Sequence, residues 1–168
     1  MVRMRAIFLL SLCFFLAGYT ASCLPCIPTL SKTKQIQALS RRGVTVVVLG
    51  DQILIVVPSD RLFQPMTANI TSQGSLLLCA VAQYINSYTK MLVKVAAYTG
   101  ETGSQRVALA LSQQQADNVA TLLRQDGINA RVLYAVGYGR DHLVERNCNH
   151  WGNDNFRIEI TLEKLEGC

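Results

Sequence analysis

The chain has 168 residues, of which 50% are hydrophobic and only 16% are charged, and its formal net charge is +5. This length fits one folded domain, and the apolar content excludes a disordered chain. Beyond the apolar block at residues 6–18, no run reaches the roughly 20 apolar residues that a helical membrane span needs. The basic residues are scattered, without interleaved aromatic residues, so nucleic-acid binding is not expected.

Residues 1–22 are typical of a bacterial lipoprotein signal peptide. Arg3 and Arg5 precede the apolar block at 6–18, and small residues follow it. The segment Thr20-Ala21-Ser22-Cys23 resembles a lipobox, in which the cysteine is acylated and the chain is cleaved just before it. Its two central residues fit this pattern, while its first residue replaces the usual leucine. Lipidation is therefore predicted at Cys23, and the alternative is ordinary cleavage that leaves this cysteine as a thiol.

The segment 23–42 is predicted to be a lipidated tether. It contains Pro25 and Pro28 and is rich in polar residues, as linkers are. Acyl chains such as palmitate contribute about 0.8 kcal/mol for each buried CH₂ group, so a triacylated cysteine anchors a chain stably. By resemblance to other lipoproteins, Leu24 in place of an aspartate indicates the periplasmic face of the outer membrane.

An exported chain meets oxidising conditions, in which cysteines can pair. With Cys23 acylated, four cysteines remain after the signal peptide, and they can pair in three ways. Cys79 lies in an apolar helical run, which favours a buried free thiol. A disulfide between Cys148 and Cys168 is a further possibility.

The remaining residues, 43–168, predict a single domain of alternating strands and helices. Valine-rich runs around a Gly-Asp turn predict a hairpin, Thr71 or Ser72 can cap a helix, and Gly127 is placed to end a second one. The expected strands are 44–49, 53–57, 91–98, 131–136 and 156–162. The first expected helix begins at about residue 72, and the second spans residues 104–125.

The helices carry apolar residues at helical spacing. In the first, these are Leu77, Val81, Tyr84, Ile85 and Tyr88. In the second, the expected inward stripe is Val107, Leu111, Val119, Leu122 and Leu123. The order ββαβαβ predicts an α+β fold in which two main helices pack on one face of a mixed β-sheet.

Several short motifs in this order resemble the C-terminal peptidoglycan-binding domain of OmpA-like proteins. The similarity covers roughly residues 44–163. The motifs are Ala97-Tyr98-Thr99-Gly100, Leu111-Ser112-Gln113-Gln114-Gln115-Ala116, Gly127-Ile128, Gly137-Tyr138-Gly139 and Asn155-Phe156-Arg157-Ile158-Glu159-Ile160. The resemblance implies the OmpA-like fold.

The same resemblance implies a clamp for diaminopimelate, a zwitterion of the cell-wall peptide. In the family, an aspartate after the Thr99 position takes the ammonium group and a helical arginine takes the carboxylate. This chain has Gly100 and Gln115 at those two positions, so both charges are missing. Arg157 remains as a possible ligand contact. Charge-assisted hydrogen bonds contribute about 1.5–3 kcal/mol and neutral ones about 1 kcal/mol, so the degenerate pocket predicts weakened peptidoglycan binding.

Other chemistry has little support in the sequence. His142, Cys148 and His150 share one segment, but they lack the partners that a metal site needs. The run Gln113–Gln115 is most simply a solvated helix face. No catalytic or phosphate-binding motif is present, so we expect a protein that is not an enzyme and has no cofactor or metal.

Two functional classes follow. The first is a peptidoglycan-binding lipoprotein that anchors the outer membrane to the wall. The second is a structural subunit of an envelope machine, docked to other core subunits. The small size, the lipobox-like segment and the stretch Val57–Phe63 resemble a lipoprotein of the Dot/Icm type IVB secretion system, which serves virulence by exporting effectors. The neutral clamp agrees better with the second class.

Overall fold

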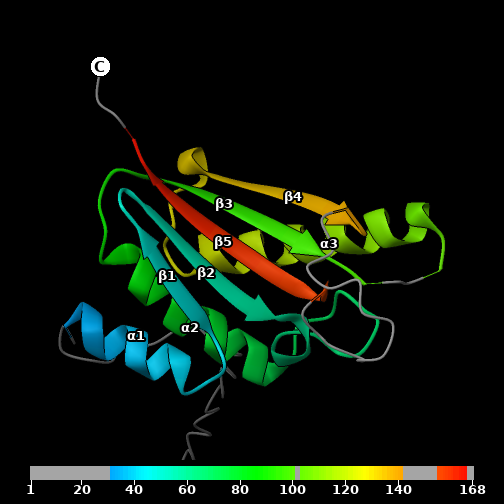
Figure 1. Cartoon of the computed structure of the whole chain (residues 1–168), viewed down its shortest axis with the longest axis horizontal. Coiled ribbons are helices and arrows are strands. Elements are labelled where there is room, and N and C mark those ends of the chain that lie inside the picture. The colour runs from blue at the N-terminus through cyan, green and yellow to red at the C-terminus, as the bar shows by residue number, and fades with distance from the viewer. Residues whose placement is uncertain (1–30, 101–102, 142–154, 166–168) are drawn as a thin grey trace, which may run out of the picture.

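The computed structural model describes residues 31–100, 103–141 and 155–165. The expected α+β class is confirmed (Figure 1). The elements in chain order are α1 (Lys32–Ser40), β1 (Thr45–Leu49), β2 (Gln52–Pro58), η1 (Ser59–Arg61), α2 (Ser72–Asn86), β3 (Met91–Tyr98), α3 (Gln105–Gln125), η2 (Ala130–Val132), β4 (Leu133–Gly139) and β5 (Arg157–Lys164). All of the expected strands and helices are present, with boundaries shifted by a few residues.

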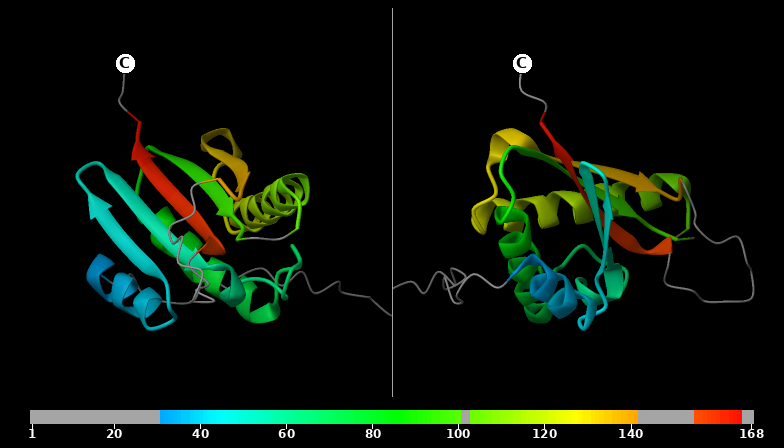
Figure 2. Two further views of the ribbon diagram at one scale, coloured as in Figure 1. Left: turned by 45° about the vertical axis from the view of Figure 1, so that its right-hand side comes forward. Right: turned by 60° about the vertical axis from the view of Figure 1, so that its left-hand side comes forward.

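The five strands form one mixed sheet in the order β1-β2-β5-β3-β4. Only β3 and β4 are parallel, and β5 pairs antiparallel with both of its neighbours. The described helices cover one face of the sheet, and none of them lies on the other, which we call the open face (Figure 2). The core lies between these layers, and β5 contributes Ile158, Ile160 and Leu162 to it. The first residue of β5, Arg157, pairs with the last residues of β2 and β3, Pro58 and Tyr98.

Each main helix begins where a side chain caps its free backbone N–H groups. The Thr71 hydroxyl accepts a hydrogen bond from the backbone N–H of Gly74 at 2.9 Å, and this fixes the start of α2. The Ser104 hydroxyl accepts from the backbone N–H of Val107 at the start of α3. After α3, Gly127 adopts a positive φ of 97°, which ends the helix as predicted.

The buried side of α3 differs from the expected stripe. Val107 is 53% exposed, and the fully buried positions include the small residues Ala108, Ser112 and Ala116. The reason is a close approach between α3 and β4. A Cβ atom at Gly137 would collide with the backbone of Gln113, so the helix can face this strand only with small side chains.

The segment predicted as tether contains a helix that the sequence reading missed. In α1, Leu39 is 2% exposed and belongs to the hydrophobic core. The Lys32 ammonium lies 3.5 Å from the centre of the Tyr88 ring, a cation–π contact. Residues 32–40, which the sequence places in the tether, therefore pack as part of the domain. The predicted signal peptide and Cys23 lie outside the described residues.

The expectation of a free, buried thiol at Cys79 is wrong. This cysteine is half-buried on α2 and disulfide-bonded. It is the one cysteine within the described ranges, so its partner lies outside them. Cys148 and Cys168 lie outside them as well. Across the described ranges, none of the helices has the length and apolar character that crossing a membrane requires.

We expect Gly137→Ala to destabilise the fold. With free space, this change would stabilise a protein by restricting the unfolded chain, but here the new methyl group meets the backbone of α3. The free energy of unfolding should fall by about 1–3 kcal/mol, as in other overpacked sites. Urea unfolding followed by circular dichroism measures this, with Gln114→Ala at an exposed position of α3 as the control. An unchanged midpoint for Gly137→Ala would contradict the close packing of α3 on β4.

Candidate functional site

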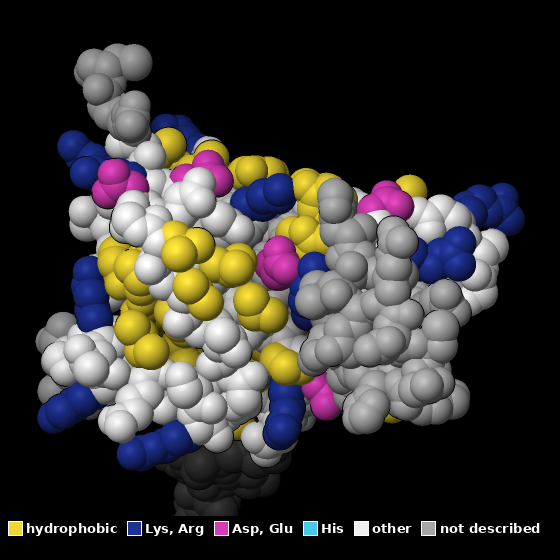
Figure 3. Space-filling model, in the orientation of Figure 1, with side chains coloured by type: hydrophobic (Ala, Val, Ile, Leu, Met, Phe, Trp, Pro, Cys, Tyr) yellow, Lys and Arg dark blue, Asp and Glu magenta, His cyan; other side chains and the backbone are white. Residues whose placement is uncertain are grey.

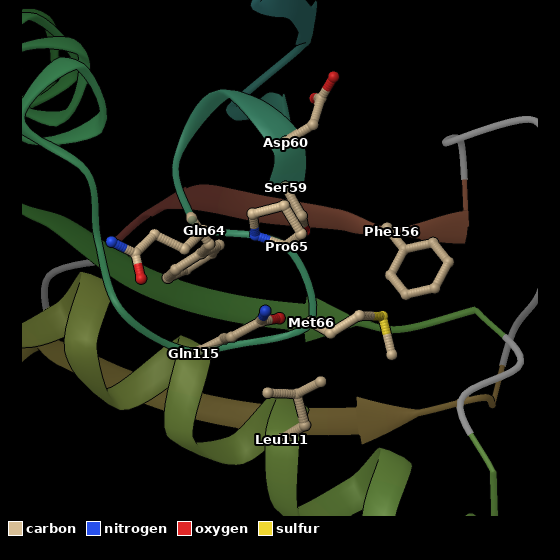
Figure 4. Close-up of a pocket in the computed structure, with 9 residues that line it drawn as sticks. Ser59, Asp60, Gln64, Pro65, Met66, Leu111, Gln115 and Phe156 are labelled. Carbon is tan, nitrogen blue, oxygen red and sulfur yellow. The ribbon is translucent and has the colours of Figure 1, made fainter.

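A pocket of about 280 Å³ lies beside Gln115, one of the two clamp positions (Figure 4). It is formed by η1 and the loop after it, by α3 and by the residue before β5. As far as the described residues form them, its walls are mostly apolar and contain one acidic and no basic side chain. The lining residues are Ser59, Asp60, Phe63, Gln64, Pro65, Met66, Leu111, Gln115 and Phe156.

Gln115 is only 4% exposed, so the predicted solvated helix face is wrong at this position. Its Nε2 donates to the backbone carbonyl of Thr67 at 2.8 Å. One turn further along α3, the Nδ2 of Asn118 donates to the carbonyl of Ala68 at 2.8 Å. These two amides attach the loop that follows η1 to the helix. The sequence signal for this role was two amide side chains at the i, i+3 spacing.

Gln113 also has a structural partner. Its Oε1 accepts a hydrogen bond from the backbone N–H of Gly137 at 2.8 Å. The Ser112 hydroxyl accepts in the same way from Gly139 at 2.8 Å. The polar run in α3 therefore binds the strand on one side and the loop on the other. The sequence had predicted that these glutamines form a solvent-exposed helix face.

Two polar atoms of the pocket residues are buried without a hydrogen-bond partner. They are the Oε1 of Gln115 and the hydroxyl of Ser59. A buried polar group left unsatisfied costs about 1–3 kcal/mol. Ser59 is held in place through its backbone N–H, which donates to the carbonyl of Phe156 at 2.9 Å. Both atoms are buried within the wall of the pocket and are not exposed to its open space.

Gly100, the other clamp position, lies against the ring of Phe156. A Cβ atom at Gly100 would overlap that ring. In the OmpA-like motif, the position of Phe156 is an arginine. The aspartate of the family is therefore absent here, and an aromatic side chain occupies the space beside its backbone.

Thr99 is fully buried, and its hydrogen bonds stabilise the fold. Its backbone N–H donates to the carbonyl of Gly139 at 2.8 Å, and its hydroxyl donates to the carbonyl of Ala108 at 3.4 Å. It joins the end of β3 to β4 and α3. It is not among the residues that line the pocket.

The structure separates Arg157 from the other clamp positions. Successive residues of a strand point to opposite faces, so Ile158 enters the core while Arg157 lies on the opposite face of the sheet, where it is only 8% exposed. Its Nε lies 2.7 Å from the Oε1 of Glu159, and its guanidinium stacks on Tyr98 at 4.0 Å from the ring centre. Figure 3 views this open face, where hydrophobic side chains gather over β1 and β2.

An aromatic and ionic cluster accompanies Arg157 on the open face. Tyr98 stacks on Tyr138 with ring centres 5.1 Å apart. The ammonium of Lys94 donates to the Tyr138 hydroxyl at 2.8 Å. Burial, followed by the charge of Glu159, raises the pKa of Tyr98 to about 12. This cluster holds the open face together and lies away from the pocket.

The potential metal ligands cannot be placed. His142, Cys148 and His150 lie outside the described residues. Within the described ranges, no three His, Cys, Asp or Glu side chains are grouped so as to hold a metal ion.

A sequence profile of the OmpA family matches residues 62–155. The match covers more than half of the chain and includes both clamp positions, so this protein belongs to the OmpA family.

Two curated relatives agree with this assignment. The chain is 35% identical over 124 residues to the probable lipoprotein YiaD of Escherichia coli, covering 73% of this chain and 57% of the relative. It is 33% identical over 90 residues to the peptidoglycan-associated lipoprotein of Legionella pneumophila, covering 50% of this chain and 48% of the relative. The chain thus spans about half the length of these relatives.

Solved structures show the same fold. The cell wall anchor of the type VI secretion system from Pseudomonas aeruginosa superposes with a TM-score of 0.69 at 23% identity, covering 79% of this chain and 96% of that one. The peptidoglycan-associated lipoprotein from Burkholderia pseudomallei gives a TM-score of 0.53 at 25% identity, covering 61% and 87%. The expected OmpA-like fold is confirmed.

The raised pKa of Tyr98 predicts a loss of stability at high pH. Unfolded tyrosine ionises near pH 10, whereas folded Tyr98 keeps its proton until about pH 12. Its contribution is therefore complete below pH 10 and is lost as the pH rises from 10 to 12, by at most about 1.4 kcal/mol per pH unit. In urea unfolding at several pH values, Tyr98→Phe should lessen this slope. Tyr134→Phe, at an exposed position of β4, is the control, and equal slopes for wild type and Tyr98→Phe would contradict the assignment.

Proposed function

We propose that this protein is an outer-membrane lipoprotein that acts as a non-catalytic structural component of the Dot/Icm type IVB secretion core complex. Its resemblance is to the lipoprotein of that system called IcmN or DotK. In this role, the OmpA-like domain docks onto other core subunits and no longer depends on a diaminopimelate clamp. The observation that carries the proposal is the pocket beside Gln115, where the described lining residues include no basic side chain.

The chemistry of the clamp positions supports this role. A zwitterionic ligand needs a cation for its carboxylate and an anion for its ammonium group. Gln115 offers a neutral amide that already holds Thr67, and Gly100 is covered by Phe156. Burying an unpaired carboxylate here would cost far more than one neutral hydrogen bond returns. In this proposal, the domain keeps its fold while its binding of diaminopimelate is weakened.

The membrane attachment is proposed to use Cys23. The probable lipoprotein from Escherichia coli and the peptidoglycan-associated lipoprotein from Legionella pneumophila are both named as lipoproteins. The lipobox-like segment 20–23 lies a short stretch of sequence before α1. A lipid on Cys23 would therefore hold the domain close to the periplasmic face of the outer membrane.

A second candidate function is a peptidoglycan-binding lipoprotein that anchors the outer membrane to the cell wall. It is favoured by the similarity to a protein named peptidoglycan-associated lipoprotein. The two candidates differ in whether the domain itself holds the wall.

We expect the wild-type protein to sediment only weakly with isolated peptidoglycan. Gly100→Asp, Gln115→Arg and Phe156→Ala together restore both charges and clear the ring from position 100, so binding should rise about tenfold or more. Without Phe156→Ala, the gain should be smaller, because the ring still overlaps a side chain at position 100. Gln114→Arg adds a charge at an exposed position of α3 and is the control. Wild-type binding as tight as that of the restored variant would reject the proposal in favour of the wall anchor.

The docking role is tested by purification from detergent-solubilised membranes. The wild-type chain should co-purify with other secretion core subunits. The same experiment with Cys23→Ala should find the chain in the soluble periplasmic fraction, because the lipid anchor is lost. Purification of the wild-type chain alone from every envelope fraction would contradict the docking role, and an unchanged membrane fraction for Cys23→Ala would contradict the anchor.

A further inference from the structure

The sheet ends on one side in a strand without the usual protection of a sheet edge. β1 is the outermost strand beside β2, and no described strand pairs with its other side (Figure 1). Its sequence TVVVL contains no charged residue and no proline, and its pairing with β2 has no bulge. Native proteins use such features to keep a sheet edge from pairing with another chain. The outer side of β1 is therefore able to accept a further strand.

Three consecutive apolar side chains of β1 are exposed. Val47 is 36% exposed, Val48 55% and Leu49 61%. Val48 pairs with the buried Ile53 and so faces the helix layer, whereas its two neighbours lie on the open face. Exposure on both faces shows that α1, which packs against β1, leaves this end of the strand uncovered. A contiguous exposed apolar surface indicates an interaction site.

We propose that β1 pairs antiparallel with β1 of a second copy of this chain, so that two five-stranded sheets form one continuous sheet. A two-fold axis perpendicular to the sheet relates the copies and passes beside Val47. In this register Val47 lies opposite Val47 of the partner subunit. Val46 lies opposite Val48 of the partner subunit.

The backbone of β1 favours this register. β1 and β2 are joined by the two-residue turn Gly50-Asp51, in which the glycine has a positive φ of 59°, as in tight hairpins. The turn closes on a hydrogen-bonded pair at Leu49, and such pairs alternate along an antiparallel ladder. The N–H and C=O groups of Val46 and Val48 therefore point away from β2. Pairing Val46 with Val48 of the partner subunit satisfies all of these groups, whereas a shifted register leaves part of them without partners.

Side chains that are exposed in a single copy are covered in the pair. On the helix side, Val48 meets Val46 of the partner subunit, and on the open face Val47 meets Val47 of the partner subunit. Leu49 lies opposite Thr45 of the partner subunit, where it extends the apolar surface over β1 and β2 (Figure 3). Cross-strand pairs of β-branched residues stabilise sheets. The seam therefore buries the apolar groups that a single copy leaves in water.

The charges beside the strand are complementary as well. In the same register Asp51 lies opposite Gly43 of the partner subunit, so the exposed Arg42 of the partner subunit comes beside the Asp51 carboxylate. Within its own chain, Asp51 has an ion pair with Lys164 at 4.0 Å, and both side chains are largely exposed. The two-fold axis repeats the contact between Arg42 and Asp51 at the other end of the seam. This complementarity favours a second copy of the chain over an unrelated strand.

The symmetry suits the predicted membrane anchor. A two-fold axis perpendicular to the sheet keeps the helix layers of both copies on the same side, and α1 belongs to that layer (Figure 2). The predicted lipids on Cys23 of the two copies can therefore enter one membrane. Attachment to one membrane raises the effective concentration of each copy for the other, so a short seam is sufficient. The pairing requires neither the pocket beside Gln115 nor a role in secretion.

The test is disulfide crosslinking of the full chain in the cell envelope. Val47→Cys places two thiols opposite each other at a non-hydrogen-bonded pair, whose Cα atoms lie about 4.5 Å apart, within the reach of a disulfide. We expect oxidation to give a band at twice the chain mass on a non-reducing gel, which the wild type lacks. Leu49→Cys is the matched control, because its two thiols lie about 13 Å apart along the seam and should not join.

Variants of the purified full chain in detergent test the same seam by sedimentation, with circular dichroism to verify folding. Val47→Lys sets two ammonium groups opposite each other and should weaken the dimer at least tenfold. Tyr134→Lys is the control, at a 41% exposed position of the opposite edge strand β4. Arg42→Glu or Asp51→Arg alone should weaken the dimer several-fold, and the two together should restore it, because the ion pair forms again with exchanged signs.

A monomeric wild-type chain without a Val47→Cys crosslink would overturn the proposal. A Leu49→Cys band as strong as that of Val47→Cys would reject the register. A Val47→Cys crosslink to a different protein would assign the edge to a partner strand and so exclude the second copy. If Val47→Lys does not fold, the cysteine variants and the exchange of Arg42 and Asp51 decide, and a double variant that stays monomeric would contradict the pairing.

Discussion

The close approach of α3 to β4 is the constraint on which the site depends. Gly137 and Gly139 allow the helix to lie against the strand, and two side chains of α3 accept hydrogen bonds from their backbone N–H groups. This contact fixes the rotation of α3 about its own axis. Once the rotation is fixed, position 115 must face the loop after η1, whatever residue stands there. The pocket is therefore a consequence of how helix and strand pack.

Gln115 combines a structural role with a chemical one. One atom of its amide holds the loop through Thr67, and the other remains without a partner within the wall of the pocket. An arginine could hold the same carbonyl and still keep donors for a ligand, because its guanidinium has five N–H groups. Replacement by glutamine thus preserves the attachment of the loop while it converts the free part of the side chain from donor to acceptor.

Local patterns predicted the fold well, whereas long-range contacts decided the site. The strand 91–98 and the cap at Thr71 follow from β-branched residues and a short-range hydrogen bond, so the sequence shows them directly. The burial of Gln115 depends on a carbonyl 48 residues away, and no periodicity contains that information. The placement of Arg157 is an intermediate case. The alternation of Arg157 with the apolar Ile158 is visible in the sequence, and it places Arg157 on the face of the sheet opposite the core.

The two changes at the clamp positions depend on each other. The Phe156 ring can lie where it does only because residue 100 has no Cβ atom. An aspartate restored there alone would meet this ring and, with glutamine at 115, would add a negative charge beside a pocket whose described lining has no cation. An arginine restored alone at 115 would face a ligand whose ammonium group has no partner. Neither single step recovers the zwitterion clamp. Recovery of the zwitterion clamp therefore requires changes at both positions together.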